Sequence, residues 1–365
     1  MQHKFLAAVL LAGVLVGCVG STDYNNIEYL CCDWGPAMTL PSATNTTTQF
    51  NDAEDEIYFL KQFASFTREK KLMKGIWSRH DYEDRGKGSG IFLCKMKPDG
   101  SAKTEIMELW KNPAYPIDMQ GPSVWMNVHR KTRTIAFSIT YAGSAQTGLW
   151  TVDLDGKNLK RIIEPGMEEG RSQCINHPSW MPDGQWIVYE AGWRGTSPSH
   201  ARIARCDRDG NNRTYLTEGP EDRQPSVSPN GSKIVYLTIG ATTGGLVLMD
   251  ASGANAHALP NPADKHKGRH SGTWPEWSPD EKRIFATGTW EIEVATGKKV
   301  TGRSPRMISL EGKVLEEHSN VIMPHWGRLG LLCGGWGGGI TVVDHGFENQ
   351  KILALSATRP ATDRW

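Results

Sequence analysis

The sequence predicts an all-β protein, a six-bladed β-propeller built from four-stranded antiparallel blades. Two observations predict this fold. A hairpin pattern recurs at intervals of about 50 residues, which is the period of propeller blades. The composition is also rich in turn residues and tryptophan, with 39 Gly, 20 Pro and 14 Trp among 365 residues. Many short strands joined by tight turns are typical of such a fold.

The first half of each repeat is a hairpin that begins at a proline. The clearest copies read HPSWMPDGQWIVY (177–189), QPSVSPNGSKIVY (224–236) and WPEWSPDEKRIFA (274–286). Pro-Asp-Gly and Pro-Asn-Gly favour a tight turn, because Gly adopts positive φ at no steric cost and Asn and Asp tolerate it. An alternating strand then returns. Weaker copies begin at Pro41, Pro122 and Pro324.

The second half of each repeat is another hairpin, closed in most copies by an Asp-Gly or similar turn. Copies occupy 90–107, 148–163, 201–217, 245–259, 306–317 and 339–355. Four strands in each of six units make six blades. Seven blades is the alternative, because WEIEVATGKKVTG (290–302) could be counted as a further half. We interpret it as a hairpin insertion in the fifth unit, which already has two outer strands.

The repeat resembles that of the TolB-type propellers, whose repeats are of the PD40 or WD40-like kind. Trp277-Ser278-Pro279-Asp280 and Trp180-Met181-Pro182-Asp183-Gly184 carry the resemblance, which covers 120–330 well and 40–120 weakly. It implies the fold and no particular function, since propellers host unrelated activities. The sequence between Cys18 and Pro41 is too short for the separate N-terminal α/β domain of TolB, so a role in the Tol–Pal system is not implied.

The N-terminus has the pattern of a processing signal. Lys4 precedes an apolar run, 5–17, that is too short to span a bilayer comfortably and ends at Cys18. Leu-Val-Gly-Cys resembles the bacterial lipobox, in which the Cys is acylated and becomes the new N-terminus. An ordinary secretory peptide is the alternative.

We therefore expect a signal peptide at 1–17, a lipid-anchored linker at 18–40 and the propeller at 41–365. The lipid bilayer is the first expected partner, through acylated Cys18. Val19 is not a retention signal of the Asp type, so the resemblance implies the outer membrane of a bacterial cell envelope.

Charge and motif content exclude several function classes. The 41 basic and 40 acidic side chains nearly cancel, which argues against a nucleic-acid partner. No C-x-x-C, H-E-x-x-H, G-x-S-x-G or phosphate-loop motif occurs. We expect no cofactor, and a divalent metal held by histidines from several blades at the funnel is the open alternative. Cys94 and Cys206 fall in predicted strands and are expected to be buried.

Candidate site residues gather at one rim of the predicted propeller. The residue before each blade's proline and the connection between the second and third strands should converge there from all blades. Long loops on a rigid scaffold usually carry binding residues. The candidate ligand-binding residues are Trp77, His80, Trp193, Arg194, Gln224, Arg269, Trp274 and His325.

Two functions fit this rim. The first is a non-catalytic envelope protein that binds a glycan, a peptide or another envelope protein. The second is a carbohydrate-active enzyme, a lyase acting on an acidic, uronate-containing polysaccharide. Its candidate catalytic residues are His177 and Arg223, which would neutralise the carboxylate, and His270, which would act as the base.

Structural roles are the alternative for the same residues. His177, Arg223 and Gln224 could instead tie neighbouring blades together. Tryptophans in the Pro-x-Trp position are expected to pack inside the blades, and we place Trp125, Trp180, Trp277 and Trp326 in this class. His129 is expected in solvent, in a turn on the opposite rim.

Overall fold

The computed structural model describes residues 27–30, 49–50, 56–64, 67–68, 82–83, 89–112, 123–140, 146–168, 171–193, 200–219, 221–239, 245–259, 273–293, 299–317, 322–327, 330–334, 340–343 and 350–354. Within these ranges the regular structure consists of antiparallel strands. No helix long and apolar enough to span a bilayer occurs in this described part of the chain.

The first three sheets are built from the N-terminal half of the described strands. The first sheet has the order β1 (Ile27–Leu30), β3 (Ile57–Ala64), β6 (Ser89–Met96), β7 (Thr104–Asn112), and β2 (Gln49–Phe50) also pairs with β3. The second runs from β8 (Ser123–His129) through β9 (Thr134–Thr140) and β10 (Gly148–Asp153) to β11 (Lys160–Ile163). The third contains β12 (Met167–Glu168), β13 (Arg171–Trp180), β14 (Trp186–Trp193), β15 (His200–Asp207) and β16 (Thr214–Tyr215).

Three more sheets complete the order. The fourth contains β17 (Asp222–Val227), β18 (Lys233–Thr238), β19 (Gly245–Asp250) and β20 (His257–Ala258). The fifth contains β21 (Thr273–Trp277), β22 (Arg283–Glu293), β23 (Lys299–Ser309) and β24 (Val314–Glu317). The sixth contains β25 (Ile322–Gly327), β26 (Gly330–Gly334), β27 (Ile340–Val343) and β28 (Gln350–Ala354), and β4 (Thr67–Arg68) pairs with β5 (Tyr82–Glu83) apart from these sheets.

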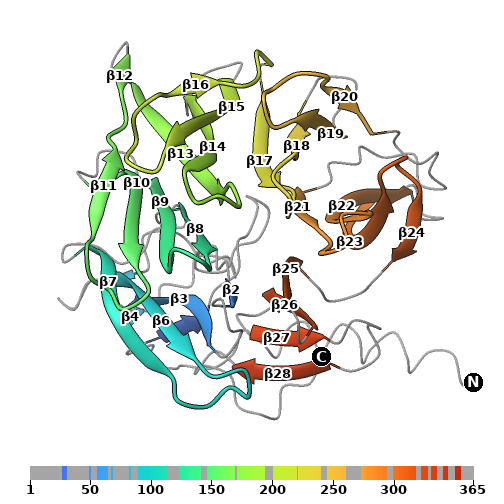
Figure 1. Cartoon of the computed structure of the whole chain (residues 1–365). Coiled ribbons are helices and arrows are strands. Elements are labelled where there is room, and N and C mark those ends of the chain that lie inside the picture. The colour runs from blue at the N-terminus through green and yellow to red at the C-terminus, as the bar shows by residue number, and fades with distance from the viewer. Residues whose placement is uncertain are drawn as a thin grey trace, which may run out of the picture.

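The sheets are arranged radially around a common axis, as Figure 1 shows. Their first strands contact one another in sequence, β8 with β13, β13 with β17, β17 with β21, and β21 with β25. The all-β propeller predicted from the repeats is confirmed. Six sheets of four or five strands lie within the described residues, and six blades stays the prediction for the chain.

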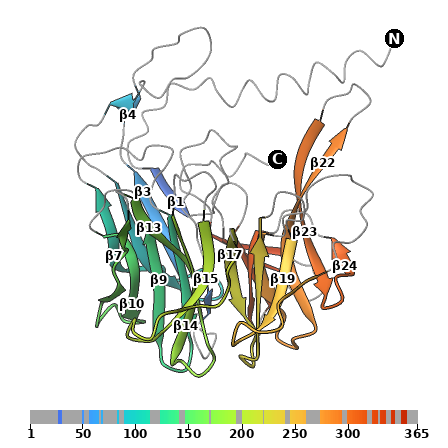
Figure 2. The same cartoon turned by 90° about the horizontal axis from the view of Figure 1, so that it is seen from above.

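The stretch at 290–302 lies within one long hairpin of the fifth sheet. β22 and β23 pair continuously from Arg283 with Ser309 to Glu293 with Lys299. β21 accompanies β22 only as far as Thr287, so the rest of the hairpin rises past the body of the sheet (Figure 2). This pairing supports the hairpin-insertion interpretation.

One strand falls in the segment that the sequence analysis assigns to a linker. β1 pairs with β3, from Ile27 with Ala64 to Leu30 with Lys61. The first sheet therefore extends into the predicted 18–40 linker. This strand was missed in the sequence because its hydrophobic pattern, only four residues long, is too short to identify a strand.

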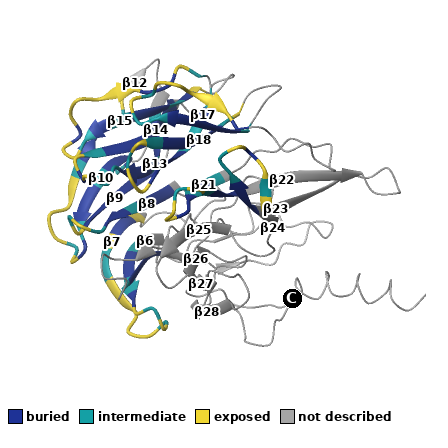
Figure 3. Cartoon of the chain, turned by 45° about the vertical axis from the view of Figure 1, so that its right-hand side comes forward, coloured by how far each residue is buried: buried dark blue, intermediate teal, exposed yellow. Residues whose placement is uncertain are grey.

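The hydrophobic core lies mainly between neighbouring sheets. One cluster joins Ala136, Leu149 and Ile163 of the second sheet to Ile175 and Ile187 of the third. Another joins the third sheet to the fourth. The strands of these sheets are accordingly buried along most of their length in Figure 3. Cohesion therefore comes from packing one sheet against the next, at about 25 cal/mol for each Å² of apolar surface buried.

Several side chains in this packing test the sequence expectations. Trp180 and Trp277 are buried, as expected for the Pro-x-Trp position, and so are Cys94 and Cys206. The expectation for His129 is wrong. Its side chain is buried, with Nδ1 2.7 Å from Thr132 Oγ1 and Nε2 3.2 Å from the carbonyl oxygen of Pro182 in the next sheet. The turn of one sheet is bonded to the turn of its neighbour, which removes His129 from solvent.

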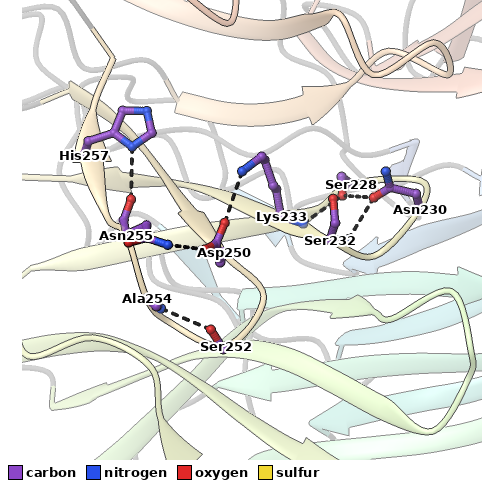
Figure 4. A network of polar contacts seen from close by, with 9 residues as sticks. All are labelled: Ser228, Asn230, Ser232, Lys233, Asp250, Ser252, Ala254, Asn255 and His257. Atoms are coloured by element: carbon purple, nitrogen blue, oxygen red, sulfur yellow. Dashed lines mark hydrogen bonds and ion pairs between the residues drawn. The ribbon is translucent and has the colours of Figure 1, made fainter.

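The turns that follow β10, β15 and β19 share one hydrogen-bonded design. An aspartate at the end of each of these strands accepts a hydrogen bond from the side-chain amide of an asparagine five residues later. The distances are 2.6 Å for Asp153 with Asn158, 2.8 Å for Asp207 with Asn212 and 2.6 Å for Asp250 with Asn255. Figure 4 shows the last of these, with Lys233 donating to the same aspartate.

Two features of this turn require glycine, the backbone conformation and the close approach of the neighbouring sheet. Gly210 has a φ of 86°, in the region that side chains disfavour. A Cβ built on it would also overlap the backbone carbonyl of Ile162 in the preceding sheet. The turn glycine thus lets one sheet approach the last strand of its neighbour.

Candidate functional site

The first strands of the third, fourth and fifth sheets are distorted at the residue before the proline. His177, Gln224 and Trp274 have φ values of 49°, 54° and 54°, and each lies at a register shift in its strand pairing. Positive φ is uncommon for residues other than glycine and is costly for a bulky side chain. The same strain at the same place in three successive sheets marks this position as special. It is the position where the sequence repeats vary.

The centre of the site is Glu190 of β14, a residue that the sequence analysis did not identify. Its carboxylate is only 3% exposed. Oε2 lies 2.9 Å from Nδ1 of His177 and accepts the backbone N–H of Gln224 at 3.2 Å. Oε1 lies 3.5 Å from Nη1 of Arg223. Because an ionised carboxylate only accepts hydrogen bonds, Nδ1 of His177 carries the hydrogen.

The electrostatic balance keeps Glu190 ionised. Burial by itself would raise the pKa of Glu190. The charge and hydrogen bond of His177, the Arg223 guanidinium and the Gln224 amide outweigh burial, so the pKa lies below its usual value of 4.5. At neutral pH the site therefore holds a buried anion surrounded by donors from the third and fourth sheets.

The side chain of Gln224 continues these contacts into the fifth sheet. Its Oε1 accepts the backbone N–H of Trp274 at 2.8 Å. Glu190 thus bonds the strained backbone of the fourth sheet, and Gln224 bonds that of the fifth. The geometry supports a tie between blades for Gln224, which was the structural alternative to its predicted ligand-binding role.

Aromatic rings cover this polar centre. Trp125 of β8 is 3% exposed, and its ring centroid lies 3.8 Å from that of His177. It also lies 6.5 Å from the ring of Trp274, which belongs to the non-adjacent fifth sheet. Rings from the second, third and fifth sheets therefore meet at the axis. Together, Glu190, His177, Arg223, Gln224, Trp274 and Trp125 form what we call the axial cluster.

The expectation that Trp125 packs inside its blade is wrong. Two residues separate Trp125 from Pro122, whereas one residue separates Trp180 from Pro178. Trp125 pairs with Ser138, and counting back from the hairpin turn gives it the position that His177 holds in the next sheet. By the same count Val128, which pairs with Ile135, holds the position of Trp180, which pairs with Ile187. Pro122 is therefore not the equivalent of Pro178, and Trp125 reaches the axis.

The structure brings together four of the predicted site residues, His177, Arg223, Gln224 and Trp274. Trp193 ends β14 and His325 lies in β25, but their side chains fall outside the described part. The remaining predicted residues lie outside the described residues altogether: Cys18, Trp77, His80, Arg194, Arg269 and His270.

A weak signal for Glu190 was present in the sequence. The equivalent positions, three residues after the first isoleucine of the second strand, hold Ser138 in β9 and Leu237 in β18. A glutamate there interrupts an otherwise apolar or neutral buried strand, and buried charges are paired. Its partners come from other sheets, so no local motif revealed them.

The same residues do not form a cluster of metal ligands. Within the described ranges, no group of three or more His, Cys, Asp or Glu side chains is placed to hold a metal ion. Glu190 and His177 form a pair, not a set of ligands. A divalent metal at the funnel stays an untested alternative.

Comparison with known proteins concerns the fold. No family model matches the chain. Similar solved structures include a puromycin hydrolase, at 13% identity and a TM-score of 0.50, covering 91% of this chain and 57% of that chain. TolB from Acinetobacter baumannii matches at 14% identity and a TM-score of 0.42, covering 85% of this chain and 67% of that chain. An oligogalacturonate lyase from Vibrio parahaemolyticus matches at 14% identity and a TM-score of 0.44, covering 68% and 64%. The structural neighbours of this chain thus include TolB among other β-propellers, and at these identities the likeness is one of fold alone.

Proposed function

We propose that this protein is a non-catalytic binding propeller of the bacterial cell envelope, which holds a glycan, peptide or protein partner at the axial cluster. The observation that carries the proposal is the buried, charge-balanced pairing of Glu190 with His177 and Arg223. Two of the three candidate catalytic side chains, His177 and Arg223, are engaged by one carboxylate. Such a cluster is rigid and suits binding, since preorganised groups lose little freedom when a ligand arrives.

Exposure within the cluster favours binding over acid–base chemistry. The His177 side chain is 14% exposed and lies under the Trp125 ring, whereas the Arg223 side chain is 32% exposed. A general base must come within hydrogen-bond reach of the proton that it removes. Arg and Trp are the residue types that dominate binding energy at interfaces. Arg223 and the half-buried Trp274 are therefore the expected contact residues.

The proposed location rests on the N-terminal sequence. We expect acylated Cys18 to hold the propeller at the outer membrane. Metabolic labelling with a radioactive fatty acid tests the anchor. Label should enter the wild-type protein and be lost in Cys18→Ser, and equal labelling of both would overturn this part of the proposal.

Binding is tested with the full chain in lipid nanodiscs. A panel of envelope glycans and peptides is titrated by calorimetry against wild-type protein, Trp274→Leu and Tyr215→Leu, a matched change on the outer strand β16. A saturable ligand whose affinity falls at least 10-fold in Trp274→Leu alone supports the axial site. Binding that depends on Tyr215 and not on Trp274 would place the site elsewhere, and no binding across the panel would refute the function.

A lyase is the second candidate, favoured by one contact. The predicted base is His270, which lies outside the described residues, and the predicted role of His177 is to neutralise the carboxylate. The 2.9 Å pairing of His177 Nδ1 with a buried carboxylate would instead orient the imidazole of His177 as a general base. Ultraviolet absorbance of the unsaturated uronate product is the assay. Turnover of an acidic polysaccharide by wild type and its loss in His177→Ala would establish the lyase, and no turnover on any acidic polysaccharide would exclude it.

A further inference from the structure

The charges of the axial cluster point to the kind of ligand it takes. Glu190 is its buried anion, and two basic side chains, Arg223 and His177, contact it. The guanidinium of Arg223 is charged at every relevant pH. The charge of Arg223 offsets that of Glu190, so the buried carboxylate does not leave a net negative charge that would repel an anion. An anionic ligand is therefore compatible with the cluster, whereas a cationic one would meet two basic groups.

The position of Arg223 suits an anion that arrives from solvent. It lies in β17 directly before Gln224, and its side chain is 32% exposed while its partner Glu190 is 3% exposed. The buried carboxylate contacts Nη1 of the guanidinium, and about a third of the Arg223 side chain is exposed. A guanidinium held in this way is preorganised for a carboxylate, because its planar donors match two carboxylate oxygens.

An aromatic side chain belongs to the same cluster. Trp274 is half-buried, its backbone N–H is bound by Gln224, and its ring lies near that of Trp125. Gln224 follows Arg223 in β17, so the strand that carries Arg223 is hydrogen-bonded directly to β21, the strand that carries Trp274. Indole faces pack against flat apolar surfaces such as sugar rings.

From this juxtaposition we propose that the axial cluster recognises a ring that bears a carboxylate, of the uronate type, with the carboxylate at Arg223 and the ring against Trp274. The inference rests on the proposed binding function and deepens it, because it specifies the ligand class. It applies equally to a free acidic oligosaccharide and to a uronate within an envelope polymer. These two sources share the chemistry that Arg223 would recognise.

The experiment compares one ligand with and without its charge. Trigalacturonate and its methyl ester have the same rings, and only the first is anionic. Calorimetry on the full chain in nanodiscs should show the acid binding at least 10-fold more tightly than the ester, since hydrogen bonds to a charged group are stronger than those between neutral groups. Raising the salt concentration should weaken binding of the acid and leave that of the ester unchanged.

Variants then locate the contact. Arg223→Gln should bind the acid at least 10-fold more weakly and reach the affinity of the ester, and Arg223→Lys should recover part of the loss because it restores the charge. Arg202→Gln is the matched control, an exposed arginine of β15 that stacks on Tyr215. Circular dichroism checks that each variant is folded, and the comparison of acid with ester on wild-type protein needs no variant.

The outcomes separate this inference from the function on which it rests. Equal affinities for the acid and the ester would overturn the inference and leave the binding function standing. The same holds if neither binds while other glycans or peptides of the panel do. If the anionic preference survives in Arg223→Gln, the carboxylate binds elsewhere and the inference is wrong. A panel without any ligand would remove the proposed function as well. For a uronate within a polymer, a polymeric uronate should bind with the same preference as the trimer.

Discussion

Replacing Glu190 with alanine removes the acceptor on which the third and fourth sheets converge. The carboxylate is 3% exposed and receives His177, the Gln224 N–H and the Arg223 guanidinium. Removing one partner of a buried ion pair typically costs about 3–5 kcal/mol, because the remaining charge is left uncompensated. The upper half of that range applies here, since the Gln224 N–H also loses its acceptor.

The expected loss is large enough to measure in two ways. Against a total stability of about 5–15 kcal/mol, Glu190→Ala should lower the midpoint of urea unfolding clearly. With an unfolding entropy of about 2.1 cal/mol/K per residue, a loss of about 4–5 kcal/mol should lower the melting temperature by roughly 5–7 °C. Glu190→Gln keeps one acceptor oxygen and should lose less than Glu190→Ala.

A double-mutant cycle isolates the ion pair. Glu190→Gln and Arg223→Gln are measured separately and together, and a coupling energy of about 1 kcal/mol or more is expected for groups in contact. A loss below about 1 kcal/mol in Glu190→Ala, with no coupling to Arg223, would refute the reasoning, because an ordinary substitution costs as much.

Three further predictions follow from the same structure. The pKa of Glu190 is lowered in the folded protein, so the stabilising effect of its carboxylate is present above the usual value of 4.5 and is lost as the pH falls below it. The difference in unfolding free energy between wild type and Glu190→Gln, measured by urea unfolding, should therefore be full at pH 7 and disappear in acid. A difference that grows in acid would contradict the assignment. Gly210→Ala should lower the free energy of unfolding by about 2 kcal/mol or more, because of its φ of 86° and the overlap of a Cβ with Ile162. Gly245→Ala is the control: a Cβ there meets nothing within 4 Å, so the unfolding free energy should change by less than about 1 kcal/mol. Equal effects would show that the close approach of the sheets does not require glycine at position 210. Ser138→Ala, at the position equivalent to Glu190, removes a buried hydroxyl for which the described residues provide no hydrogen-bond partner. The melting temperature should therefore stay constant or rise. A fall of several degrees would indicate a hydrogen bond to a residue outside the described ranges.

The fold could be predicted from the sequence because its signals are local. Each Pro-Asp-Gly and Asp-Gly turn fixes one hairpin, and the roughly 50-residue period then dictates the radial arrangement. The buried positions of Trp180 and Trp277 follow from the same repeat. The prediction for Trp125 failed because its position was counted from Pro122, which is not the equivalent of Pro178. Counted from the hairpin turn, Val128 holds the blade-packing position and Trp125 lies three residues before it.

The site could be predicted only in part. The residues before the prolines were identified, and the structure brings His177, Gln224 and Trp274 to one end of the axis. Glu190 was missed because its role depends on partners 13 and 34 residues away that belong to two sheets. The distinction between tying blades and binding a ligand depends on which atoms are buried. One sequence does not contain that information.

The long hairpin of the fifth sheet makes the end of the molecule that holds Trp274 asymmetric. β21 stops pairing with β22 at Thr287, next to Trp274, and β22 and β23 continue from there to Glu293 and Lys299. A chain-like ligand that extends from Trp274 toward the fifth sheet would meet this projection. The hairpin would therefore restrict that direction for a bound polymer, and shortening it should remove the restriction without moving the point of attachment.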